Sequence, residues 1–271
     1  MAPGRLGGPG SPAAGAGRSV GRPGPPAPGV TQRVSVSSQG AAGDNDSVLA
    51  AVSADGRFVA FWSFAANLVP GDTNGTSDVF VHDRQTATTE RVSVTSRERQ
   101  ATGAEQGGVL DTNWGRPAIS ADGRFVAFAS SATNLVRGDR NQTVDIFVRD
   151  RVAGTTERVS LPGDRRQEAN SDSSGPAISA DGRFVAFTSF ATNLVAGDTN
   201  FADDVFVRDR QTQTTVRSSV ATDGTETGFE LGSGNASLSA DGQAVAFESE
   251  GALVAEDSGF PVDVFVHDEQ P

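Results

Sequence analysis

The sequence contains no cysteine, lysine or tyrosine and only one methionine. Without cysteine, the chain has no disulfide bonds and no thiolate chemistry. It has no apolar run near the roughly 18 residues that a transmembrane helix requires. The formal net charge of −12 argues against nucleic acid as a partner, because a phosphate backbone attracts basic surfaces. We therefore expect a function that needs no thiol, no transmembrane segment and no nucleic acid.

Residues 1–29 consist mainly of glycine, proline and alanine, with three arginines and no apolar run. Such a segment cannot bury enough apolar surface to fold, so we expect it to be disordered. It also lacks the apolar core of a secretory signal peptide. The sequence thus predicts a disordered tail at 1–29 and a folded domain at 30–271.

Four near-copies of one segment fill the rest of the chain. Three copies read SADGRFVAF and the fourth reads SADGQAVAF, and they begin at Ser53, Ser120, Ser179 and Ser239. A second block, DVFVHDR in the first copy, follows each of them and begins at Asp78, Asp145, Asp204 and Asp263. Because both blocks recur after 59 to 67 residues, the repeat is a structural unit.

Each unit predicts four β-strands and no helix. In the third unit, residues 184–187 and 205–207 are short runs of β-branched, aromatic and small apolar residues, as strands are. Residues 155–160 alternate polar and apolar side chains, and residues 176–179 lead directly into an Asp-Gly pair. That pair is a strong signal for a tight turn between antiparallel strands.

Four units of four antiparallel strands predict an all-β protein, and a four-bladed β-propeller is the architecture that arranges such sheets radially. We expect small residues on the innermost strands, at the crowded hub, and these positions hold Ala51, Ala118, Ala177 and Ser237. The fourth unit lacks its last strand, whereas residues 31–35 (TQRVS) match it. The N-terminal strand is therefore predicted to close the ring on the last sheet.

The blocks S-A-D-G-R-F-V-A-F, D-V-F-V-R-D and T-T-E-R-V-S, in this order, resemble the WD-repeat-like β-propeller repeat of TolB-type proteins over residues 31–268. That family usually has proline where this chain has Ala54, Ala121, Ala180 and Ala240. Its units are commonly shorter and its rings have more blades. The resemblance implies a binding platform, an envelope component or an appendage to an enzyme. It also suggests a secreted or periplasmic protein, and the missing export signal leaves the localisation open.

The negative charge is concentrated in the long connections between strands. In the predicted topology these connections share one face and carry 22 of the 34 acidic residues but only 7 of the 22 arginines. They are residues 37–48, 64–78, 95–116, 131–145, 161–175, 190–204, 220–234 and 250–263. Such a face would attract cations or a basic partner surface. The alternative is that acidic loops only keep the protein soluble.

Three of these connections contain the pattern G-D-x-N-x-x-x-D. The residues are Asp72, Asn74, Asp78, Asp139, Asn141, Asp145, Asp198, Asn200 and Asp204. Oxygen ligands at alternate positions, closed by a further carboxylate, suit Ca²⁺, which takes about 6 to 8 oxygens. The sequence therefore predicts calcium at these three loops. The alternative is that the same side chains bond the backbone of their own turns.

Residues 95–116 form the connection that most breaks the repeat symmetry, because it is longer than its counterparts. It contains Trp114 beside Glu105 and Asp111, which predicts a site where an aromatic ring stacks on a sugar or anchors a partner side chain. The alternative is that Trp114 packs over its own blade. We expect the other tryptophan, Trp62, to lie on the rim.

Catalysis has little support in the sequence. The two histidines, His82 and His267, occupy the position that Arg149 and Arg208 fill in other units, which predicts exchangeable surface residues and no general base. The G-x-S-x-G elbow of α/β-hydrolases and the phosphate-binding P-loop are both absent.

We therefore predict a monomeric, non-catalytic propeller that binds a protein partner through its acidic loops, with Ca²⁺ ordering three of them. A carbohydrate-binding propeller that uses Trp114 is the alternative. A third hypothesis is an enzyme that cleaves polysaccharide with two carboxylates.

Overall fold

The computed structural model describes Met1 and residues 29–102, 115–163, 167–255, 257 and 261–269. All regular elements within these residues are strands. No helix in this part of the chain is long and apolar enough to cross a bilayer. The all-β class that the sequence predicts is confirmed.

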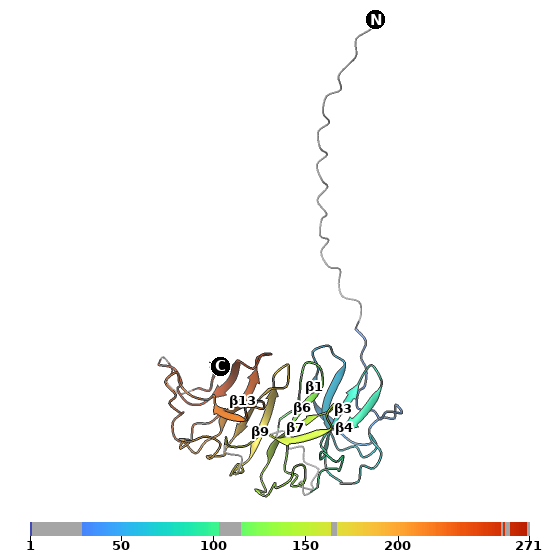
Figure 1. Cartoon of the computed structure of the whole chain (residues 1–271), viewed down its shortest axis with the longest axis horizontal. Coiled ribbons are helices and arrows are strands. Elements are labelled where there is room, and N and C mark those ends of the chain that lie inside the picture. Colours follow the sequence, from blue (N-terminus) through green and yellow to red (C-terminus); the bar gives the residue numbers. More distant parts are fainter. Residues whose placement is uncertain (2–28, 103–114, 164–166, 256, 258–260, 270–271) are drawn as a thin grey trace. The chain divides into compact units, whose positions relative to one another are not determined.

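The strands form four antiparallel sheets, which follow one another along the chain (Figure 1). The first sheet contains β1 (Ser47–Val52), β2 (Phe58–Ser63), β3 (Asp78–Asp83) and β4 (Thr88–Arg91). The second contains β5 (Ala118–Ile119), β6 (Phe125–Ser130), β7 (Asp145–Asp150) and β8 (Thr155–Arg158). The third contains β9 (Ser173–Ile178), β10 (Phe184–Ser189), β11 (Asp204–Asp209) and β12 (Thr214–Arg217). The fourth contains β13 (Ser233–Leu238), β14 (Ala244–Ser249) and β15 (Asp263–Asp268).

The Asp-Gly pair makes the tight turn between the first two strands of each sheet, as predicted. In the first sheet, the Ser53 hydroxyl donates to Asp55 at 2.7 Å and accepts the Phe58 N–H at 2.9 Å. Gly56 completes the turn with φ of 72°, in the left-handed region that favours glycine. The other three units repeat these bonds, so the SADG sequence encodes the turn.

The innermost strands of all four sheets line one cavity of about 660 Å³. Its lining includes Ala51, Ala118, Ala177 and Ser237, the small residues predicted at the hub. Small side chains are needed here because four strands converge on the same space. This radial arrangement of sheets around a hub is a β-propeller with four blades.

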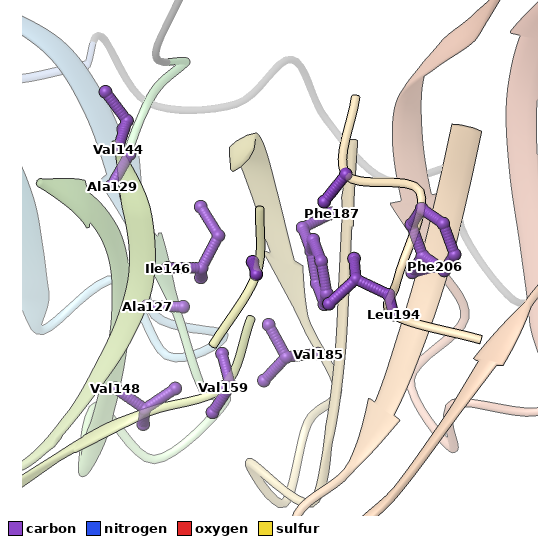
Figure 2. Packing of buried hydrophobic residues seen from close by; sticks show 12 residues of the cluster. Ala127, Ala129, Val144, Ile146, Val148, Val159, Val185, Phe187, Leu194 and Phe206 are labelled. Carbon is purple, nitrogen blue, oxygen red and sulfur yellow. The ribbon is translucent and has the colours of Figure 1, made fainter. Parts of the chain in front are cut away.

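Neighbouring sheets pack face to face through apolar side chains. Between the second and third sheets (Figure 2), Ile146 and Val148 of β7 belong to one buried cluster with Val185 and Phe187 of β10. Since the middle strands are covered on both faces, β3, β7 and β11 are buried along their whole length. Within each sheet, two phenylalanines on the second and third strands stack at about 6 Å.

A phenylalanine latch joins each sheet to the next. A Cβ built on Gly182 would lie 2.2 Å from the Phe125 ring, which shows that this ring lies directly against the glycine of the following turn. Arg210 lies over the same ring, 4.5 Å from its centroid, and donates to the Gly182 carbonyl. Phe58 meets Gly123 and Phe184 meets Gly242 in the same way. The motif therefore requires glycine for two reasons. The turn has a positive φ, and the phenylalanine ring of the preceding sheet leaves no space for a Cβ atom.

The alanines of the SADG turns add a series of backbone hydrogen bonds between sheets. Ala54 N–H donates to the Ala121 carbonyl at 3.1 Å, Ala121 to Ala180 at 3.0 Å, and Ala180 to Ala240 at 2.8 Å. Proline has no N–H to donate. The alanines that distinguish this chain from the family it resembles thus carry the bonds that link its sheets.

Closure of the ring by the N-terminal strand stays a prediction from the sequence. Residues 29–35 form no strand, and the last sheet has three strands with β15 at its edge. Val34 packs against the first sheet. The fourth repeat differs from the others at this junction, because Gln243 and Ala244 replace the Arg-Phe pair of the other copies. The last sheet therefore has no aromatic ring to place against Gly56, which has only the Arg84 side chain within 4 Å.

Candidate functional site

The long connections lie at one end of each sheet, because consecutive strands are antiparallel. An asparagine in each connection between the second and third strands of the first three sheets bonds the segment that enters the same sheet. Asn134, for example, accepts the Thr102 N–H at 2.8 Å and donates to the Gln100 carbonyl at 3.0 Å. Asn67 and Asn193 make equivalent bonds. We call the surface made by these connections the long-connection face.

An arginine occupies the centre of each predicted calcium loop. In the second sheet, Arg158 Nη1 lies 2.8 Å from Asp145 and 3.1 Å from Asp139, and its Nη2 lies 2.7 Å from Glu168. Asn141 donates to Asp145 at 3.0 Å. The Asp139 and Asp145 carboxylates are buried, and the guanidinium supplies the positive charge that balances them.

The other two copies repeat this arginine centre. Arg91 lies 2.8 Å from Asp72 and 3.1 Å from Asp78, and Asn74 donates to Asp78. Arg217 contacts Asp198, Asp204 and Glu226 at 2.7 to 3.4 Å, while Asn200 donates to Thr227. Within the described residues, no group of three or more acidic or histidine side chains is arranged to hold a metal ion. Calcium at these loops stays a prediction from the sequence.

Burial raises the pKa of five carboxylates in these centres, and the pKa values of two of them reach about 6. Burial, which disfavours the charged form, raises the pKa of Asp139 to about 6 although Arg158 acts against it. The pKa of Asp198 is raised to about 6 by burial and then by the negative charge of Asp204. In the unfolded chain the same carboxyls have a pKa near 3.8. The folded protein therefore holds these two protons more tightly than the unfolded chain does.

We expect the double variant Asp139→Asn/Asp198→Asn to gain stability relative to wild type as the pH rises from 4 to 8. A raised folded pKa contributes stability that is complete below the unfolded pKa and is lost as the pH rises through about 6. His82, whose pKa burial lowers, acts in the opposite direction but is common to both proteins. Thermal unfolding at a series of pH values measures the difference in Tm. A difference that does not change with pH contradicts the prediction.

The predicted recognition residues Glu105, Asp111 and Trp114 lie outside the described residues. Trp62 is described, and the expectation that it lies on the rim is wrong. It is only 6% exposed and packs in the cluster between the first and second sheets. The second sheet covers the face of β2 that carries Trp62, so this side chain is buried between two sheets.

An exposed pair of phenylalanines, which the sequence analysis did not single out, lies on the long-connection face. Phe201 and Phe229 are 56% and 66% exposed, and their ring centroids lie 5.8 Å apart. Phe201 has φ of 54°, a left-handed conformation that is rare for a bulky residue. Gly75 and Gln142 fill this position in the first two sheets. The signal in the sequence was a phenylalanine where a turn favours glycine.

Two acidic residues follow the phenylalanines of this pair closely along the chain. Glu230 follows Phe229, is exposed, and donates its backbone N–H to the Asn200 carbonyl at 2.8 Å, which ties the two connections together. Asp203 is exposed two residues after Phe201. It also lines a cavity of about 530 Å³ with Glu248 and Glu250. The site therefore combines apolar aromatic surface with negative charge.

Similar solved structures are propellers. TolB from Acinetobacter baumannii is 18% identical, with 83% of this chain and 41% of that chain covered and a TM-score of 0.46. The β-propeller domain of the Trilobed protease from Pyrococcus furiosus is 11% identical over 84% of this chain and 56% of that one, with a TM-score of 0.47. The acylaminoacyl peptidase of Pyrococcus horikoshii is 13% identical over 78% and 29%, with a TM-score of 0.41.

The chain spans less than two thirds of each of these similar structures. No family model matches the sequence, and no curated protein matches it. This chain is a four-bladed β-propeller in its fold. The propeller's activity has to be inferred from its own surface.

The propeller buries the histidine that was expected on the surface. His82 is 1% exposed, and its Nδ1 lies 2.9 Å from the Thr89 hydroxyl. That hydroxyl donates to the Val36 carbonyl, so Nδ1 carries the proton and donates to Thr89. Arg149 and Arg208 are equally buried at the same position. The expectation of exchangeable surface residues is wrong because this strand is covered on both faces.

Proposed function

We propose that this propeller is a non-catalytic binding module whose long-connection face takes a basic protein segment, with Phe201 and Phe229 at the centre of contact. The exposed aromatic pair carries the proposal. Two large apolar side chains with more than half of their surface in water stabilise the fold little, and such exposed surface marks a binding site.

The backbone at Phe201 supports a role in binding. A bulky residue in the left-handed region costs roughly 1 kcal/mol or more, and strain of this kind persists where function requires it. Phe201 recovers little of this cost by packing, because its ring is exposed. The side chain is thus better explained by a partner that covers it than by the stability of the free protein.

The partner's charge follows from the surroundings. The protein has a net charge of −12, and the exposed residues Asp203 and Glu230 follow Phe201 and Phe229 closely in the sequence. A guanidinium on a partner would stack on the ring faces and pair with these carboxylates. The propeller itself uses this contact at its latches, where Arg151 lies 4.5 Å from the Phe58 ring centroid. We therefore infer a segment that carries arginine beside apolar residues.

Replacing Phe201 with glycine is expected to strengthen the fold and weaken binding. Glycine adopts a positive φ without strain, so the free energy of unfolding should rise by about 1 kcal/mol. The probe is a fluorescein-labelled hexapeptide of alternating arginine and leucine, and its affinity, measured by fluorescence anisotropy, should fall about tenfold. Phe229→Ser should weaken binding similarly, and the wild-type affinity should fall with added salt.

Phe190→Ser is the matched control, because Phe190 is 45% exposed and is not stacked on either ring of the pair. It should leave peptide binding unchanged. A peptide with glutamate in place of arginine should not bind. Equal binding by all variants, or selective binding to a glycan array with no binding to the peptide, contradicts the proposal; the second result would favour the carbohydrate-binding alternative. Calcium titration into metal-stripped protein tests the predicted loops separately, since the proposed contact does not require the ion.

A further inference from the structure

The outer edge of the last sheet is exposed where the corresponding strands are buried. Val264 and Val266 on β15 are 73% and 67% exposed, whereas the equivalent Val205 and Val207 on β11 are at most 3% exposed. Asp263 is exposed, whereas Asp204 is fully buried. β11 pairs with an outer strand, β12, but β15 has no strand beyond it in the described part of the chain.

The segment that enters the last sheet is equivalent to the segments that hold the outer strands of other sheets. Each outer strand bonds the segment that enters its sheet: the Thr89 hydroxyl of β4 donates to the Val36 carbonyl, and the Thr156 hydroxyl of β8 donates to the Val94 carbonyl. Each of these two segments contains one isolated β-bridge at the equivalent position. The bridge pairs Val36 with Ala42 in the first segment and Val94 with Gln100 in the second. Residues 220–226, which enter the last sheet, have the same bridge. They are shaped to hold a strand against β15.

The chain contains one further segment with the side chains that this position requires. Arg91 and Ser93 of the first sheet both bond Asp78, through contacts of 3.1 and 2.5 Å. Aligned on the repeat, Arg33 and Ser35 correspond to this pair, and Asp263 corresponds to Asp78.

The same alignment extends the match along the strand. It places Thr31 opposite His267, as Thr89 lies opposite His82. An arginine, a serine and a threonine would thus meet their usual partners on an otherwise exposed strand. The charges and the hydrogen-bonding groups are complementary.

Neighbouring residues of this segment are held at the first sheet. Val36 and Ser38 bond Thr89 of β4, and Val34 packs with Phe61 and Phe80. In the described residues, the last sheet packs against the third, and Ala244 provides no latch toward the first. The same segment of a second molecule can pair with β15 without bringing the first and last sheets of one chain together.

We propose that the edge of β15 accepts residues 31–35 of a second copy of this chain as its fourth strand. The second copy offers its own β15 in return, so two reciprocal contacts close a symmetric dimer in which β15 is no longer an edge strand in either copy. The first sheet of one copy then covers Val264 and Val266 of the other. The junction lacks the phenylalanine latch, so it is the weakest contact between sheets and should dissociate on dilution. This inference does not depend on the proposed function.

Disulfide trapping tests the pairing directly, because the sequence has no cysteine of its own. The pairing of His82 with Thr89 sets the register, which places Thr31 opposite His267. A Thr31→Cys chain is mixed with a His267→Cys chain carrying an affinity tag of different mass, and the mixture is oxidised gently. We expect a covalent heterodimer joined through residues 31 and 267, identified by mass spectrometry. In the control, Val216→Cys, an exposed position on β12, replaces His267→Cys and should give at least tenfold less of this product.

Charge reversal gives a second readout that does not use cysteine. Arg33→Asp alone or Asp263→Arg alone should shift the protein to monomer in light scattering. Mixing the two variants should restore the dimer, because one junction then pairs the two substituted residues and the other pairs the native Arg33 and Asp263. The proposal is overturned if the mixed cysteine chains give no more heterodimer than the control. It is also overturned if a double Thr31→Cys/His267→Cys chain forms only an internal disulfide and stays monomeric, because that result places the strand on its own sheet.

Discussion

Gly182→Ala is expected to destabilise the propeller by about 3 kcal/mol or more. Alanine at φ of 75° costs roughly 1 to 2 kcal/mol in the left-handed region. In addition, the new methyl group would lie 2.2 Å from the Phe125 ring, so the ring or the turn must move, and overpacking of this kind costs about 1 to 3 kcal/mol. The displaced ring would also lose its contacts with Arg124 and Arg210. Chemical denaturation measures the loss.

Gly56→Ala is the matched control for this latch. Gly56 makes the same turn with φ of 72°, but no aromatic ring lies near it and the closest atom to an added Cβ is 3.7 Å away. Its alanine variant should lose only the backbone part, about 1 kcal/mol. The difference between the two variants isolates the contact between sheets. If both lose the same amount, the latch contributes nothing and the glycines serve the turn alone.

Arg158→Met should cost about 3 to 5 kcal/mol, because it removes the cation from among three carboxylates, two of them buried. Methionine keeps much of the side-chain volume, so the loss reports the missing charge. Without the guanidinium, the pKa of Asp139, which is already raised to about 6, should rise further. The loss should therefore be larger at pH 8 than at pH 5.

Two further variants make this experiment decisive. Arg124→Met removes an arginine whose side chain is 42% exposed and paired with Asp150, and it should cost less stability than Arg158→Met because solvent screens the exposed pair. Adding Asp139→Asn and Asp145→Asn to Arg158→Met should recover part of the stability, because it removes the uncompensated charges. If Arg158→Met costs no more than Arg124→Met, the three arginine centres do not hold the long connections in place.

Much of the scaffold follows from the sequence because its signals are local. The Asp-Gly pairs specify turns, the apolar runs between them specify strands, and a repeat of about 60 residues specifies blades. The small hub residues Ala51, Ala118, Ala177 and Ser237 were also predictable, since equivalent positions in a radial fold share the same crowding.

The candidate site was harder to predict because it depends on contacts distant in sequence. The aspartates at 72 and 78 resemble metal ligands until Arg91, which lies on another strand, is placed between them. A signal was present nonetheless: the arginine recurs in each outer strand, as the two aspartates recur in each connection. Phe201 and Phe229 lie 28 residues apart, and only the fold brings their rings together.

Burial of His82 was missed for a related reason. A histidine that alternates with arginine along a repeat has the pattern of a surface position. In this propeller the strand lies between two sheets, and the polar head groups bond carbonyls and hydroxyls inside the protein. The choice between histidine and arginine at this position reflects hydrogen bonding in the interior, so it does not indicate that the position is exposed to solvent.

The Ala54–Ala121–Ala180–Ala240 series of backbone bonds runs in one direction and ends at the last sheet. The second and third sheets are held from both sides, whereas the first and last sheets each pack against a single neighbouring sheet in the described residues. The last sheet also has only three strands there, so an isolated molecule frays from its carboxyl-terminal blade inward. The amide protons of β15 have the shortest route to solvent exchange, and those of β6 and β7 have the longest.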